Sequence, residues 1–208
     1  MIKEEFLDAV NSYSSTPDNA NVLWQEVETK YAEKSRHYHT LDHLESLIKE
    51  LLPVKATFSN WSVVVFAAVY HDIIYKATKT NNEERSAALA VQRLKAIAAP
   101  PELIRRCREF IVATKRHEPA DNEIDHFTDA DLSILGSSPD TYQSYTKQIR
   151  KEYSIYPDLF YKPGRKKVLL HFLGMPHIYK STFFRDKYET AARRNLNDEL
   201  KGLGVVNG

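Results

Sequence analysis

Apolar residues recur along most of the chain at the three-to-four-residue spacing of amphipathic helices. No segment shows the sustained alternation of apolar and polar positions, rich in β-branched residues, that is typical of a half-buried strand. The prediction is therefore an all-α fold, a bundle of helices without a sheet. The pattern predicts helices over residues 44–51, 82–98, 101–111, 140–153, 165–173 and 183–203.

One further predicted helix, from Trp61 to Tyr75, is apolar on almost every side. Its polar residues are Ser62 and the doublet His71-Asp72. A helix that is hydrophobic all round is buried, and a buried imidazole and carboxylate need a compensating partner. A bound divalent metal compensates both groups at once. A buried His-Asp ion pair with a purely structural role is the alternative.

Short polar loops are expected at 53–60, 76–81 and 117–127. Thr128 is expected to cap a short helix over 129–135, which a glycine ends. There is no internal repeat, low-complexity tract or Gly/Ser linker. We therefore expect one all-α domain with a helical extension at its C-terminal end.

Composition and charge are those of a soluble globular protein, with 42% hydrophobic and 27% charged residues. The net charge of +1 argues against a strongly electrostatic nucleic-acid binder. The single cysteine, Cys107, excludes an internal disulfide, and its apolar helical neighbours indicate a core thiol. No signal peptide or membrane-spanning stretch is found, so we expect a cytoplasmic protein without a membrane partner.

Further histidines and acids stand at two other places. His39 and His43 are four residues apart, close to one helical turn, just ahead of a predicted helix, so both can face one cavity. A solvated loop rich in histidine is the alternative. Asp129 and Asp131 stand two residues apart in the short helix. The negative charge of Asp129 would be favourable in the first turn of this helix, at the positive end of the helix dipole, whereas Asp131 lacks so simple a structural explanation.

In chain order these pieces read H…HD…D, which resembles the HD superfamily of metal-dependent phosphohydrolases. The likeness extends to a bacterial group of predicted members of that superfamily, and it implies a single HD-type domain over residues 1–208. The core would span about 24–136 and the helical extension about 137–208. The matching motifs are R-x-Y-H-x-x-x-H at Arg36 to His43, H-D-x-x-Y at His71 to Tyr75, N-E-x-x-S-A at Asn82 to Ala87, A-T-x-x-H at Ala113 to His117, D-A-D-L-S-x-L-G at Asp129 to Gly136, and I-R-x-E-Y at Ile149 to Tyr153.

The resemblance implies that His43, His71, Asp72 and Asp131 bind one divalent metal ion per chain, of Mn, Fe, Co, Ni or Mg. Two imidazoles and two carboxylates suit such an ion and leave positions for water and a phosphate oxygen. The implied reaction is hydrolysis of a phosphate ester by attack of metal-bound water. The resemblance does not supply the substrate, but the near-neutral net charge favours a small molecule, and a nucleotide is the expected class. Asp72 would take part directly, and His39 would protonate the leaving group.

Other residues are expected to act around the metal. Arg36 is the predicted phosphate clamp, because a guanidinium pairs with phosphate in a bidentate way. Lys115 and His117 are further predicted substrate contacts, and His117 is also the best candidate for a ligand to a second ion. Glu83 is expected to orient water or a ligand. The alternative for each is an ordinary surface or helix-end residue.

Two other functions stay open from the residues alone. The HD scaffold also resembles that of di-iron oxygenases, whose additional histidine ligands are scarce in this chain. A regulatory module that binds a nucleotide and a metal without turnover is the other possibility. The expected partner is a small-molecule phosphate substrate, with no nucleic acid and no membrane, and homo-oligomer formation is left open.

Overall fold

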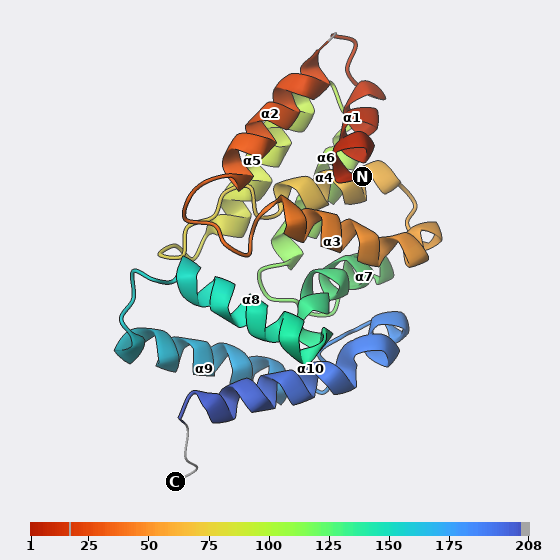
Figure 1. The fold of residues 1–208 in the computed structure, drawn as a ribbon. Coiled ribbons are helices and arrows are strands. Elements are labelled where there is room, and N and C mark those ends of the chain that lie inside the picture. Colours follow the sequence, from red (N-terminus) through yellow and green to blue (C-terminus); the bar gives the residue numbers. More distant parts are fainter. Residues whose placement is uncertain (17, 205–208) are drawn as a thin grey trace. The chain divides into compact units, whose positions relative to one another are not determined.

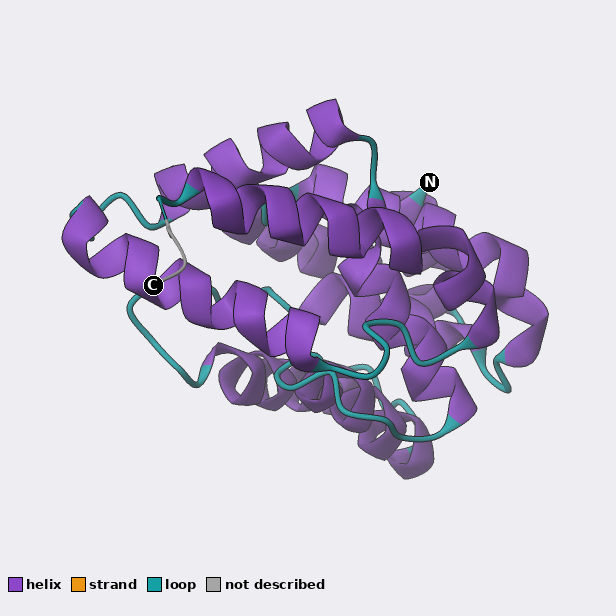
Figure 2. Ribbon diagram, turned by 90° about the horizontal axis from the view of Figure 1, so that it is seen from below, coloured by secondary structure: helices purple, strands orange, loops and turns teal. Residues whose placement is uncertain are grey.

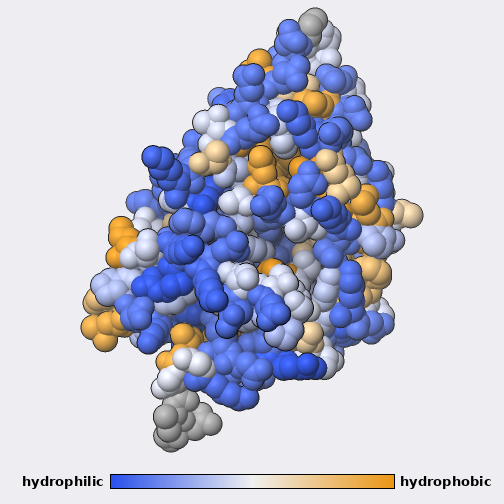
Figure 3. Space-filling model, in the orientation of Figure 1, coloured by the Kyte–Doolittle hydropathy of each residue, from blue (hydrophilic) through white to orange (hydrophobic). Residues whose placement is uncertain are grey.

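The computed structural model describes residues 1–16 and 18–204, which form ten α-helices and two 3-10 helices and no strand (Figure 1 and Figure 2). The predicted all-α class is confirmed. The chain divides into two compact units, Met1–Thr128 and Asp129–Gly208. Hydrophilic residues predominate on the face drawn in Figure 3. No helix in the described part is long and apolar enough to cross a membrane.

The central element of the first unit is α4, which packs against α1, α3, α5 and α6. Every residue of α4 from Val63 to Tyr70 is buried, as the apolar pattern predicted. Cys107 is also buried, and burial raises the pKa of its thiol, so the predicted core thiol is confirmed. The elements of this unit are α1 (Ile2–Asn11), α2 (Asn19–Tyr31), α3 (Leu41–Leu51), η1 (Leu52–Thr57), α4 (Trp61–Tyr70), α5 (Asn82–Ala96), α6 (Pro101–Ala113) and the first residues of α7 (Asn122–Asp131).

The C-terminal end of α4 differs from the prediction. The apolar pattern predicted a helix through Tyr75, whereas α4 ends at Tyr70 and a turn follows it. Carbonyl groups of this turn accept hydrogen bonds from the side chains of Arg36 and Ser86 instead of continuing the helix. These partners lie in other segments of the chain, so the local apolar pattern did not reveal the end of the helix.

The loop predicted at 117–127 is wrong in its second half, because α7 begins at Asn122. The side chain of Asp121 accepts hydrogen bonds from two backbone amides of the first turn, at 3.0 and 3.1 Å. This capping aspartate was the signal that the sequence interpretation missed. Thr128 lies inside α7 and does not cap a helix, and the rest of the predicted short helix is the 3-10 helix η2 (Leu132–Gly136).

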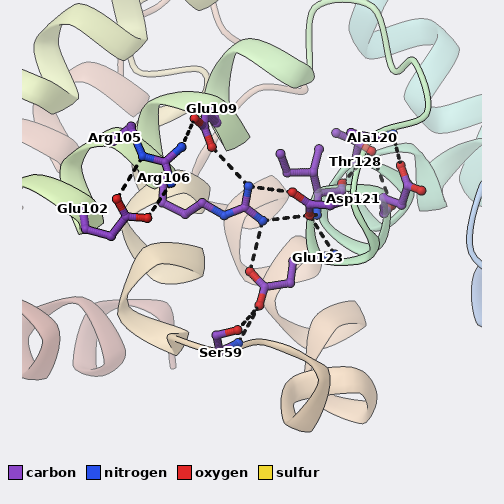
Figure 4. A network of polar contacts seen from close by, with 11 residues as sticks. Ser59, Glu102, Arg105, Arg106, Glu109, Ala120, Asp121, Glu123 and Thr128 are labelled. Carbon is purple, nitrogen blue, oxygen red and sulfur yellow. Dashed lines mark hydrogen bonds and ion pairs between the residues drawn. The ribbon is translucent and has the colours of Figure 1, made fainter.

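A network of ion pairs holds the beginning of α7 (Figure 4). The guanidinium of Arg106, in α6, lies 2.7 Å from Asp121, 3.2 Å from Glu123 and 3.1 Å from Glu109. Glu123 also accepts a hydrogen bond from the amide of Ser59, at 2.7 Å, in the loop before α4. The network therefore joins α6, the start of α7 and the entry to α4.

The second unit consists of η2, α8 (Pro139–Glu152), α9 (Asp158–Gly174) and α10 (Thr182–Gly202). α10 packs against η2 and α9, and α8 packs against η2. A Cβ atom at Gly136 would lie 2.6 Å from the Cβ of Tyr188, so glycine permits this close approach of η2 and α10. The predicted helices at 140–153 and 183–203 are confirmed, whereas α9 begins well before the predicted residue 165 and contains Pro163.

Candidate metal centre

Two histidines from different segments meet in the interior of the first unit. His43 lies in the first turn of α3, and His71 follows directly after α4. They are only 6% and 1% exposed. Their Nε2 atoms are 3.2 Å apart, although the residues are 28 positions apart in the chain. Packing of α3 against α4 thus brings two imidazole nitrogens to one point.

The ring of His71 is held by the last turn of α4. Its Nδ1 lies 2.9 Å from the carbonyl oxygen of Ala68. A carbonyl oxygen only accepts hydrogen bonds, so Nδ1 carries a proton and donates it to Ala68. A hydrogen bond of this kind orients a metal-binding imidazole and sets its tautomer. Nε2 is therefore the ring nitrogen of His71 through which a metal would bind.

The carboxylate of Asp72 lies beside His71 and His39. Its Oδ2 is 3.1 Å from Nε2 of His71 and 3.7 Å from Nε2 of His39. Burial acts to raise the pKa of Asp72, but the adjacent His71 and His39 outweigh burial and hold this pKa well below its ordinary value. The side chain is 16% exposed and carries its negative charge at neutral pH.

Nε2 of His43 and Oδ2 of Asp72 lie close to Nε2 of His71, at 3.2 and 3.1 Å. A proton on Nε2 of His71 can form one straight hydrogen bond, to either neighbour, whereas a metal ion binds all three atoms together. The donor set of two imidazoles and a carboxylate therefore fits a divalent ion. His43 and His71 also belong with Asp131, the last residue of α7, to a set of side chains that could hold a metal ion.

His39 lies at the rim of this cluster, with its side chain 18% exposed. Its ring centroid is 5.9 Å from that of His43 and 4.3 Å from that of Tyr75. His39 and His43 thus lie in the same cluster, as their spacing predicted. Tyr75 was not assigned a role from the sequence, although its spacing after the doublet was the available signal.

Arg36 is buried, 5% exposed. Its Nη1 donates to the carbonyl oxygens of Asp72, at 2.8 Å, and His39, at 3.2 Å. Its Nη2 donates to the carbonyl oxygen of Ile73, at 2.9 Å. These contacts hold the backbone on both sides of the centre. Direct contact of Arg36 with a phosphate stays a prediction.

Two residues of the N-E-x-x-S-A motif hold the turn after α4. The hydroxyl of Ser86 accepts from the amide of Ile74 at 3.0 Å and donates to its carbonyl at 3.3 Å. The side chain of Asn82 accepts from the amide of Lys76 at 3.2 Å and donates to its carbonyl at 3.0 Å. The sequence interpretation singled out Glu83 of this motif and missed the structural work of Asn82 and Ser86.

The remaining predicted site residues come from α5 and from the turn after α6. Glu83 lies in the first turn of α5, and burial together with the negative charge of Asp72 raises the pKa of Glu83. The Nζ of Lys115 donates to the carbonyl oxygen of Thr80 at 2.8 Å, in the loop between the doublet and α5. His117 has a left-handed backbone conformation, with φ of 52°. The catalytic and substrate-binding roles of these residues stay predictions.

Asp129 has a structural role in the second unit. Its Oδ2 accepts from the amide of Ser181 at 2.7 Å and from the Ser181 hydroxyl at 2.8 Å, and its Oδ1 lies 2.7 Å from Nζ of Lys180. The predicted position of Asp129 in a first turn is wrong, because α7 begins seven residues before it. Asp131 is therefore the acid of this motif that could serve a metal.

No protein-family model, curated protein or solved structure matches the chain. Its function is accordingly inferred from its own residues and their geometry.

Proposed function

We propose that this protein is a divalent-metal-dependent phosphohydrolase that cleaves a phosphate ester of a small molecule, with a nucleotide as the expected class. One observation carries the proposal: Nε2 of His43 lies 3.2 Å from Nε2 of His71, which lies 3.1 Å from the carboxylate of Asp72. The order of the motifs, which resembles that of the HD superfamily, supports the same function.

The proposed ligands are His43, His71, Asp72 and Asp131. Asp131 is included because of its place in α7. The ring of Phe127, in the same helix, lies perpendicular to the ring of His71, with centroids 6.3 Å apart. Asp131 also belongs with His43 and His71 to a set of side chains that could hold a metal ion. We propose one ion for these four ligands.

The protein's own residues have distinct tasks in this proposal. A divalent ion held there would lower the pKa of a water molecule and offset the charge on the phosphoryl group. His39 would carry the proton for the leaving group, since its ring is at the exposed rim and its Nε2 is 3.7 Å from Asp72.

The preference for a small substrate follows from charge. The chain carries a net charge of +1, without the excess of basic residues that polynucleotide binding requires. A small phosphate ester can be attracted by the metal and nearby cations alone.

The test is the release of phosphate or nucleoside from a panel of nucleotides and small phosphoesters in the presence of Mn²⁺. The variant is Asp72→Asn, and the matched control is Asp42→Asn, because Asp42 is exposed on α3 beside His43. We expect Asp72→Asn to lower turnover by more than about 100-fold, beyond the range typical of changes outside the ligand shell. The control should retain wild-type turnover.

Equal turnover by wild type and Asp72→Asn would overturn the proposal. Elemental analysis of wild type and His43→Gln separates the two parts of it. Metal bound by the wild type but not by His43→Gln, without turnover of any compound in the panel, would retain the metal site and reject the phosphohydrolase.

A further inference from the structure

We infer that Arg36 is a positioning residue that sets the geometry of the metal centre through its hydrogen bonds to the backbone, and that its charge makes the centre attractive to anions. This inference rests on the metal site of the proposed function, although not on hydrolysis. It differs from the phosphate clamp expected from the sequence, because the contacts of Arg36 are to backbone and to aromatic rings.

The segments that carry the ligands lack regular structure where Arg36 meets them. His39 precedes α3, and Asp72 and Ile73 follow α4 in a turn. Nη1 of Arg36 bridges the two segments, at 3.2 Å from the carbonyl of His39 and 2.8 Å from that of Asp72, which is 36 positions from Arg36. Nη2 adds the carbonyl of Ile73 at 2.9 Å. One guanidinium thus supplies hydrogen bonds that helix geometry would supply elsewhere.

Two tyrosines hold the guanidinium in place. Its Cζ is 4.7 Å from the ring centroid of Tyr31 and 5.6 Å from that of Tyr75. Tyr31 is itself tied to the last turn of α4, because its hydroxyl donates to the carbonyl of Val69 at 2.9 Å. The position of Arg36 is therefore fixed relative to the end of the helix from which His71 and Asp72 emerge.

The charge of Arg36 has no carboxylate partner among the described residues. Partly buried arginines elsewhere in the first unit differ: Arg93 lies 2.6 Å from Glu26, and Arg106 lies 2.7 Å from Asp121. Nε of Arg36 is also buried without a hydrogen-bond partner in the described part of the chain. A buried cation that no acid neutralises raises the positive potential around it, which favours binding of an anion.

Lysine cannot reproduce this arrangement, because its single ammonium lacks the planar fork of donors. The experiment compares Arg36→Lys with wild type, and Arg93→Lys is the matched control, since Arg93 holds Glu26 in a bidentate pair between α2 and α5. Co²⁺ affinity is measured by calorimetric titration, the Co²⁺ site by its visible absorption spectrum, and folding by thermal denaturation.

We expect Arg36→Lys to weaken Co²⁺ binding about 10- to 100-fold, the range typical of residues that orient metal ligands, and to change the absorption spectrum of the bound Co²⁺. Arg93→Lys should lower the thermal midpoint while leaving the Co²⁺ affinity and spectrum at their wild-type values. Arg36→Gly provides a second measurement, in which added ethylguanidinium should restore Co²⁺ binding. The same compound should not change Co²⁺ binding by Arg93→Gly.

Wild-type Co²⁺ affinity and spectrum in Arg36→Lys, or no rescue of Arg36→Gly, would overturn the positioning role while the metal site stands. An equal loss of affinity in Arg93→Lys would overturn it as well, because the loss would then follow general destabilisation. Absence of Co²⁺ binding by the wild type would reject the metal site itself, and the inference with it.

Discussion

Two buried polar clusters, one in each unit, differ in whether their charges balance. In the second unit, the guanidinium of Arg165 lies 2.7 Å from the carboxylate of Glu199, which also accepts from the hydroxyl of Tyr142 at 2.5 Å. In the first unit, His43 and His71 present ring nitrogens 3.2 Å apart beside an acid. In the Arg165 cluster the acid and the base satisfy each other, and we call it balanced. The cluster of His43 and His71, which we call unbalanced, brings together ring nitrogens that could hold a metal ion.

This difference separates a structural cluster from a candidate site. A buried acid and base that satisfy each other hold helices together and require nothing more from outside. A buried group of ligand atoms is unfavourable until a proton or a metal joins it, so it is retained where that ion has a use. Burial of polar residues alone does not indicate a site; the balance of donors and acceptors does.

The largest expected effect comes from breaking the balanced cluster. Arg165→Met leaves the carboxylate of Glu199, 12% exposed, without its partner. We expect the free energy of unfolding to fall by about 3–5 kcal/mol, as is typical when one partner of a buried ion pair is removed. Urea denaturation measures this loss. Lys201→Met is the control, because Lys201 is exposed and its change should cost less than about 0.5 kcal/mol. A loss as small as that of the control would contradict the comparison.

The unbalanced cluster should respond in the opposite way. The substitution His43→Leu removes one ligand atom from a buried site. In the presence of a chelator, which keeps metal away, it should change the free energy of unfolding by less than about 1.5 kcal/mol. With Co²⁺ at about 100 times its dissociation constant, the wild type should gain about 2.7 kcal/mol and the variant nothing. Denaturation with and without the ion measures both values. Strong destabilisation of His43→Leu in the chelator would show that the histidines act as a structural pair.

The smallest expected effect concerns the partly exposed ion pair between Glu26 and Arg93. The pKa of Glu26 is lowered by its hydrogen bonds from Arg93, and its side chain is 25% exposed. A lowered folded-state pKa stabilises the protein above the ordinary carboxyl pKa, and this contribution is lost as the pH falls through the lowered value. Solvent screening limits it to less than about 1 kcal/mol.

The measurement is the difference in free energy of unfolding between wild type and Glu26→Gln from pH 7 downward. We expect wild type to be the more stable at pH 7, and the difference to vanish at acidic pH. A difference that stays constant over this range would mean that the carboxylate charge contributes nothing, and that the pair is held by packing.

Local patterns predicted the helices α3 to α6 of the first unit, whereas α1 and α2 were not predicted. The stripe of α3 and the apolar run of α4 are buried as expected, because the period of apolar residues reports which face of a helix packs. The same patterns failed at the end of α4 and the beginning of α7. At the end of α4, the side chain of Arg36 donates a hydrogen bond to the carbonyl of Asp72, which a continuing helix would bond to its own backbone. At the beginning of α7, Asp121 caps a helix whose apolar period is weak.

For the candidate site, the sequence named the residues and left their arrangement open. Motif order singled out His43, His71 and Asp72, and spacing placed His39 near them. It did not distinguish Asn82 and Ser86, which hold the turn, from Glu83 between them. Hydrogen bonds of polar side chains to distant backbone leave no periodic signal, so this part of the site appears only in three dimensions.

The sequence by itself determined the all-α class, the burial of the run that ends in the His71-Asp72 doublet, and the inert environment of Cys107. Each follows from composition and period, which act over a few residues. Only the tertiary structure decided that Nε2 of His71 meets Nε2 of His43, 28 positions away, and that Arg36 binds the carbonyl of Asp72, 36 positions away. Such distances depend on how α3 packs against α4, and that packing arises from many contacts that no short segment contains.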